Sequence, residues 1–114
     1  GAKNLTDAFS GLGAHQMSES RDIFIKAPEI AEKGAIVPIE VTSKLNGTRA
    51  IAILIERNNN PFAANFAIPA GTEGYVSTRV KMSGSSPVHV VVQAGDKFLH
   101  AMKDVKITIG GCGG

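Results

Sequence analysis

The sequence has no tryptophan, one tyrosine and one cysteine among its 114 residues. A single cysteine cannot form a disulfide within the chain, so a small fold held together by disulfides is excluded. With only three histidines beside it, a structural zinc site is not expected. The net charge of +2 and the few aromatic residues give no basic or stacking surface, so the composition does not indicate a nucleic-acid partner.

Long hydrophobic runs are also missing. No apolar stretch approaches the roughly 20 residues of a membrane-spanning helix, and the chain does not begin with a signal peptide. We therefore expect a soluble protein that is either cytoplasmic or already processed. At 43% hydrophobic residues, the chain can bury a core, and its length suits one domain.

The N-terminal residues 4–12 predict a short helix. Asn4 is suited to the N-cap, Asp7 lies in the first turn, and Gly13 is placed to end the helix. Its apolar residues recur at helical spacing, which puts them on one face: Leu5, Ala8, Phe9 and Leu12.

The rest of the chain alternates with the two-residue period of strands, which predicts an all-β, immunoglobulin-like antiparallel sandwich of about seven strands. Asn46-Gly47 predicts a tight hairpin, and a bulge or bend is expected near Lys103. Residues 49–57 are apolar on both faces, so we expect this strand to be central or to face a partner subunit. The predicted strands cover residues 22–27, 37–45, 49–57, 62–68, 76–82, 88–92 and 97–109.

Residues that would form a catalytic site are scarce. The acidic residues form no recognisable pair or metal-binding spacing, and Gly11-Leu12-Gly13 is too short to indicate a phosphate loop, so we do not expect an enzyme. His100 and Met102 share one strand face, and His89 lies on a neighbouring strand, so a small copper site is conceivable. Ordinary strand residues are the simpler interpretation, because copper sites usually need three converging ligands.

The only cysteine, Cys112, lies between two glycine pairs, Gly110-Gly111 and Gly113-Gly114. We expect a domain over residues 1–109 and a flexible arm over residues 110–114, because glycine cannot anchor a core. An extended arm would place the thiol roughly 10 Å beyond the last strand. Without side chains beside the cysteine, the arm is narrow enough to enter a deep slot in another protein.

No histidine or lysine is adjacent to Cys112 in the sequence to activate its thiol. An unassisted thiol with a pKa near 8.5 is only a few per cent thiolate at neutral pH, so activation must come from a partner. This pattern favours a carrier, whose thiol travels between the active sites of other proteins. The alternative is a disordered tail with an accidental cysteine or a linker.

The C-terminal residues 107–114 resemble the arm of the SoxY family, the sulfur carriers of bacterial thiosulfate oxidation. The likeness extends to the helix 5–12, to segments 27–32 and 76–79, and to the loop 56–61, in which Asn59 departs from an expected proline. The resemblance implies a periplasmic sandwich paired with a second sandwich subunit, SoxZ. It also implies that Cys112 holds sulfur species such as S-thiosulfonate and that the protein needs no other cofactor.

In that family, the haem enzyme SoxAX loads the cysteine, the hydrolase SoxB releases sulfate, and SoxCD oxidises the remaining sulfur in some bacteria. The resemblance assigns Gly110, Gly111, Gly113 and Gly114 to arm flexibility and clearance.

Two alternative functions stay open. One is a ubiquitin-like carrier with a thiocarboxylate on Gly114, which would need a β-grasp fold with a substantial helix. The other is a structural or copper-binding sandwich with an incidental cysteine.

Overall fold

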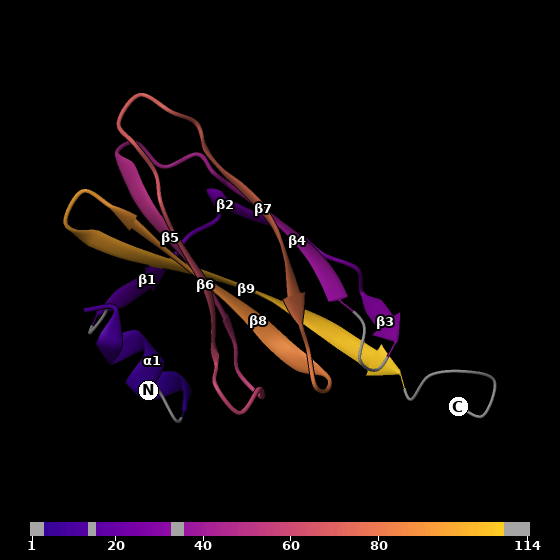
Figure 1. The fold of residues 1–114 in the computed structure, drawn as a ribbon. Coiled ribbons are helices and arrows are strands. Elements are labelled where there is room, and N and C mark those ends of the chain that lie inside the picture. The colour runs from indigo at the N-terminus through magenta and orange to yellow at the C-terminus, as the bar shows by residue number, and fades with distance from the viewer. Residues whose placement is uncertain (1–3, 14–15, 33–35, 109–114) are drawn as a thin grey trace.

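The alternating segments form two β-sheets packed face to face in the computed structural model, which describes residues 4–13, 16–32 and 36–108 (Figure 1). The larger sheet has the order β1-β9-β8-β5-β6, with β3 also paired to β9, and the smaller sheet has the order β2-β4-β7. The predicted sandwich is confirmed. Its strands are β1 (Met17–Glu19), β2 (Ile23–Lys26), β3 (Ile30–Glu32), β4 (Ile36–Ser43), β5 (Thr48–Ile55), β6 (Phe62–Ala67), β7 (Gly74–Lys81), β8 (Ser86–Ala94) and β9 (Lys97–Thr108).

The main core lies between the two sheets. Every second residue of β4 points inward, and Val37, Ile39 and Val41 are fully buried. Burial of such side chains supplies the main stabilising term, about 1.5–3 kcal/mol each. The larger sheet contributes a second set of inward residues from its central strands: Ile51, Ile53, Ile55, Val88, Val90, Val92 and Val105.

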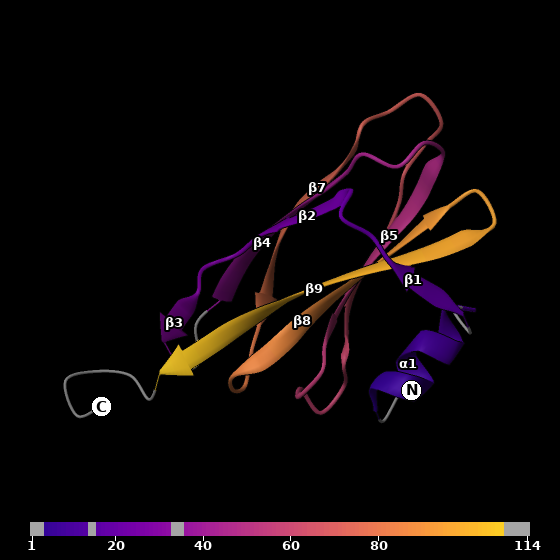
Figure 2. The same ribbon diagram turned by 180° about the vertical axis from the view of Figure 1, so that it is seen from behind.

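Helix α1 (Leu5–Gly11) covers the other face of the larger sheet, at the end of β9 opposite to Thr108 (Figures 1 and 2). Ala8 packs there in a second buried cluster with Ala52, Leu54 and Val91. β5 is therefore apolar on both faces because it is central in the sheet and covered by α1. Its predicted central position is confirmed, and its composition does not require a partner subunit to explain it.

The ends of α1 follow the sequence prediction. The Asn4 side chain accepts a hydrogen bond from the Asp7 backbone N–H at 2.9 Å, and Gly13 adopts a φ of 80° just beyond the C-cap residue Leu12. An N-cap of this kind contributes about 1 kcal/mol. None of the helices in the described residues is long and apolar enough to cross a membrane.

Two strands, β1 and β3, were not predicted. Each has only three residues, and each pairs in parallel with β9, so the sheet is not purely antiparallel. A three-residue segment is too short to show an alternating pattern, and these two are extended because the free edge of β9 supplies their hydrogen bonds.

Two details of the predicted strand connections are wrong. Asn46-Gly47 does form a turn, with a Gly47 φ of 76°, but β4 and β5 belong to different sheets and are not a hairpin. The turn lets the chain cross between sheets, so that both strands can bury their inward residues. The bulge expected near Lys103 is also absent, because β8 and β9 pair without a register shift from Ser86–Val105 to Ala94–Lys97.

Candidate functional site

The carrier residues predicted from the sequence, namely Cys112 and the four glycines around it, lie outside the described residues. The structure does define the strand that leads to them. β9 ends at Thr108, four residues before Cys112. An extended chain covers at most about 3.3–3.6 Å per residue, so the Cα atom of Cys112 lies within about 14 Å of the Cα atom of Thr108.

The last residues of β9 are held from both sides. On one side, the Ser85 hydroxyl accepts a hydrogen bond from the Ile107 backbone N–H at 2.8 Å. On the other side, β3 pairs with Lys106, Ile107 and Thr108, and the Thr108 hydroxyl donates to the Ala31 carbonyl at 3.3 Å. We call these contacts of Ala31, Ser85, Ile107 and Thr108 the arm clamp.

The arm clamp continues the sheet beyond the point where β8 ends. β8 pairs with β9 only as far as Ser86 opposite Val105, and Val105 is almost fully buried in the core. Without Ser85 and β3, the next three residues of β9 would have no hydrogen-bonding neighbours. The clamp therefore carries regular strand structure to within four residues of the cysteine.

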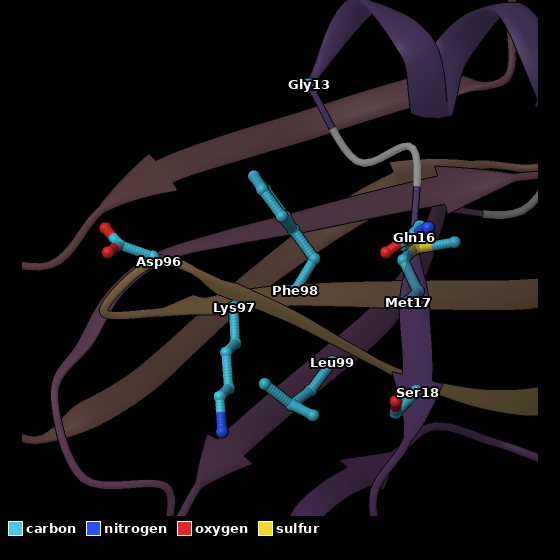
Figure 3. A pocket seen from close by; sticks show the side chains of 8 residues that line it. All are labelled: Gly13, Gln16, Met17, Ser18, Asp96, Lys97, Phe98 and Leu99. Carbon is cyan, nitrogen blue, oxygen red and sulfur yellow. The ribbon is translucent and has the colours of Figure 1, made fainter.

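A pocket lies at the opposite end of β9, between that strand and β1 (Figure 3). Phe98 points from β9 toward the α1 side of the sheet, whereas Leu99 points to the other side. Phe98 and Thr108 are ten residues apart on one strand, or about 33 Å at the usual rise. Because Cys112 stays within about 14 Å of Thr108, this pocket is out of reach of the thiol of the same chain.

The histidines considered for copper do come together, with a third residue that sequence reasoning missed. His89 Nδ1 lies 2.8 Å from His100 Nε2, and His89 Nε2 lies 2.7 Å from Glu56 Oε1. We call Glu56, His89 and His100 the histidine cluster. Glu56 could not be found from spacing, since it lies 33 positions before His89 and is brought there by the pairing of β5 with β8.

The histidine cluster is arranged for hydrogen bonding and not for chelation. Both ring nitrogens of His89 are engaged, and they face opposite partners, so Glu56 and His100 cannot converge on one ion. Across residues 4–13, 16–32 and 36–108, no group of three or more histidine, cysteine, aspartate or glutamate residues is placed to hold a metal. The copper alternative therefore gains no support from this part of the chain.

Burial changes the acidity of one member of the cluster. His89 is 6% exposed, and His100 is half-buried beside it. Desolvation is the main cause that lowers the pKa of His100 below its usual value; the neighbouring His89 lowers it further, and Glu19 acts in the opposite direction. His100 thus resists taking up a proton.

The ubiquitin-like alternative does not fit the fold. A β-grasp domain packs a substantial helix across one sheet, whereas the described residues form a two-sheet sandwich with one helix of seven residues. A carrier with its sulfur on Gly114 would therefore need a different architecture.

Comparisons with known proteins agree with the architecture. The family model for the sulfur oxidation protein SoxY matches residues 9–112. The solved structure of the sulfur carrier protein SoxY from Chlorobium limicola f thiosulfatophilum is 39% identical, with a TM-score of 0.85, and the match covers 96% of this chain and 100% of that one. No match was found among curated proteins.

A second similarity concerns the fold alone. A superoxide reductase (neelaredoxin) from Ignicoccus hospitalis has a TM-score of 0.69 at 18% identity, over 89% of this chain and 87% of that one. A second structure of that reductase gives a TM-score of 0.68 at 17% identity, over 89% and 86%. The sandwich fold is thus shared with proteins that catalyse other reactions. The family of this chain is therefore assigned from the family model and from the 39% identical carrier, and not from the fold. On both grounds, the chain belongs to the SoxY family of sulfur oxidation proteins.

Proposed function

We propose that this protein carries sulfur intermediates covalently on Cys112 and presents them to partner enzymes. The observation that carries the proposal is the family match, which extends through Cys112 itself, on a chain whose last strand ends four residues earlier. The sandwich provides a rigid mount, the arm clamp fixes where the arm begins, and the glycines give a narrow approach to the thiol.

The loading step joins two sulfur atoms. The Cys112 thiolate and thiosulfate form a new S–S bond, giving Cys112–S–S–SO3⁻ and two electrons, which a haem enzyme of the SoxAX type would accept. The thiol needs an external base or a cationic environment for this step, because its ordinary pKa of about 8.5 leaves it mostly protonated at neutral pH. The partner's active site supplies that activation.

The release step adds water to the terminal sulfur. Cys112–S–S–SO3⁻ and H2O give the persulfide Cys112–S–S⁻, sulfate and two protons, without a change in the number of electrons. A hydrolase of the SoxB type would catalyse it, and a dehydrogenase of the SoxCD type would oxidise the remaining sulfur. In both steps this chain is the substrate-bearing protein and not the catalyst.

The expected partner subunit is a second sandwich of the SoxZ type, and the expected compartment is the periplasm. The family membership supports both. A thiol that normally bears cargo is also compatible with an oxidising compartment, because a conjugated cysteine is protected from random pairing. Partners that recognise an anionic sulfur group can ignore the side chains of the arm, since glycine has none.

The test is intact-mass analysis of the protein from cells supplied with thiosulfate. We expect sulfur-containing adducts that disappear with a reductant and are absent from Cys112→Ser. The matched control is Ser18→Cys in the Cys112→Ser background, which moves the only thiol to an exposed position on β1. Adducts that persist in Cys112→Ser, or form equally on the relocated thiol of the control, would contradict specific carriage on Cys112.

A further inference from the structure

The histidine cluster lies on the outer face of the larger sheet, where α1 covers it. The Phe9 ring packs edge-on against both imidazoles, with ring centroids 5.8 Å from His89 and 6.0 Å from His100. The two imidazole planes are inclined by only 22° with centroids 5.1 Å apart, so the rings meet edge to edge through the 2.8 Å contact between His89 Nδ1 and His100 Nε2. Helix α1 and the cluster therefore form one contact through Phe9.

The hydrogen bonds assign the protons of the cluster. A carboxylate only accepts, so His89 Nε2 must carry a hydrogen that it donates to Glu56 at 2.7 Å. In a neutral ring the other nitrogen, Nδ1, is then an acceptor, and His100 Nε2 donates to it at 2.8 Å. This assignment satisfies both contacts with one hydrogen each.

The number of protons that the docked cluster can accept is limited. A first added proton goes to the second ring nitrogen of His100, Nδ1, and leaves both contacts intact. A second would place hydrogens on both facing nitrogens, His89 Nδ1 and His100 Nε2, which are 2.8 Å apart. Two donors cannot share this contact, and two adjacent cations repel each other.

Helix α1 is docked on the larger sheet mainly by two contacts. One is the contact of Phe9 with the histidine cluster, and the other is the small apolar patch around Ala8. A helix of seven residues is not stable alone in water, so it depends on packing against the sheet. That packing rests on Ala8, which is fully buried, and on the half-buried side chains around it, including Phe9. A change that disturbs the surface under Phe9 acts directly on the docking of α1.

We propose that Glu56, His89 and His100 form a proton-sensitive latch, which holds α1 on the sheet while one hydrogen lies between His89 Nδ1 and His100 Nε2 and releases it when a second added proton would put a hydrogen on both of these nitrogens. When α1 undocks, both imidazoles reach water and can each bind a proton. The docked state can bind only one of the two. Undocking is therefore coupled to proton uptake and is favoured by acid.

The charged groups around the latch are Glu56, Glu19 and Arg21. Glu56 follows β5 and faces His89, and Glu19 on β1 favours the charged form of His100. Arg21 is exposed and lines the same groove as His100 and Glu19. The group that α1 places on the cluster is the uncharged Phe9 ring. Imidazole is the side chain whose ordinary pKa lies closest to neutral pH, so the two histidines are the proton acceptors that the proposal invokes.

The test is amide hydrogen exchange on the full chain between pH 8 and pH 5, corrected for the intrinsic pH dependence of exchange. We expect the opening constant of the α1 amides to rise up to about tenfold per pH unit below pH 6.5 for each proton taken up, relative to β8 amides. The double variant His89→Gln/His100→Asn keeps polar side chains at both positions and should lose this dependence. If it does not fold, His100→Asn alone should reduce the slope.

The remaining histidine provides the control. His15→Asn should keep the full pH dependence. Protection of α1 that follows β8 at every pH would overturn the proposal, as would an undiminished slope in His100→Asn or a slope lost in His15→Asn. Nitrogen-15 NMR gives an independent check, because the proposal requires the Nε2–H tautomer of His89 at pH 8, and the Nδ1–H tautomer would overturn it.

Discussion

The Ser85 side chain takes the place of a strand beside Ile107. Its Oγ accepts from the Ile107 N–H at 2.8 Å and lies 3.4 Å from the Ile107 carbonyl oxygen, as an adjacent backbone would. Because β8 pairs only as far as Ser86, this one side chain extends the ladder on that side of β9. The fixed base of the predicted arm therefore depends on a serine 27 positions before Cys112 in the sequence.

Removing the Ser85 hydroxyl should loosen that base. Ser85→Ala leaves the Ile107 N–H without its partner, which should lower the free energy of unfolding by about 1 kcal/mol and increase exchange at residues 106–108. Amide exchange and urea denaturation measure these effects. Ser18→Ala, at an exposed position on β1, should leave both unchanged. Unaltered exchange at Ile107 in Ser85→Ala would show that β3 alone holds the end of β9.

Side chains added to the arm should impair delivery without affecting the fold. Gly111→Val and Gly113→Val should leave thiol titration and thermal stability unchanged. They should slow turnover by the loading and hydrolysing enzymes roughly tenfold or more, because a branched side chain hinders the correct placement of the thiol in the partner's active site. Steady-state assays with purified partners measure this. Gly84→Val is the control, since a Cβ there meets no atom within 4 Å. Unchanged turnover would mean that clearance is not why glycine occurs in the arm.

One glycine of the body should be far less tolerant than Gly84. A Cβ at Gly74 would lie 2.9 Å from the Ser43 carbonyl oxygen and 3.3 Å from Thr48 Cγ2. Gly74→Ala should therefore lower the free energy of unfolding by about 1–3 kcal/mol through overpacking. Gly84→Ala should change it by less than about 0.5 kcal/mol. Equal midpoints in urea for the two variants would contradict the close approach of β4 and β7 at this point.

The stability of the whole protein should fall in mild acid through His100. The pKa of His100 is lowered in the folded protein by burial, so the unfolded chain, with a pKa near 6.5, binds this proton first. The contribution of neutral His100 to the free energy of unfolding is complete above pH 6.5. It is lost as the pH falls toward the lowered pKa of the folded state. Urea denaturation at pH 8, 6.5 and 5.5 should show a smaller loss for His100→Asn than for the natural chain. Parallel pH curves would contradict this assignment.

Much of the sandwich could be predicted because its two-residue period is strong. In β4 the inward residues Val37, Ile39 and Val41 alternate with polar or partly exposed ones, and the structure buries them all. The cap at Asn4 was also predictable, because an N-cap is local chemistry. Sheet membership was not, since the turn at Asn46-Gly47 looks the same whether the strands pair or separate into two sheets.

The features that the sequence did not reveal depend on distant partners. β1 and β3 are strands only because β9 is beside them, and Glu56 reaches His89 only through the pairing of β5 with β8. For the site, the order is reversed. Cys112 and its glycines were predicted from the sequence and stay a prediction because they lie outside the described residues, whereas the arm clamp at the end of β9 was found only in the structure.

The fixed position of Thr108 also sets a limit on every enzyme that uses the proposed carrier. The sandwich is far wider than a glycine chain, so only the segment beyond the clamp can enter a partner, and four residues extend about 14 Å. The reacting atoms of a loading enzyme and of a hydrolase must then both lie no deeper than about this distance below the surface that meets the end of β9. Because all partner enzymes would receive the thiol on the same short segment, their active sites must have a similar maximal depth even where their chemistry is unrelated.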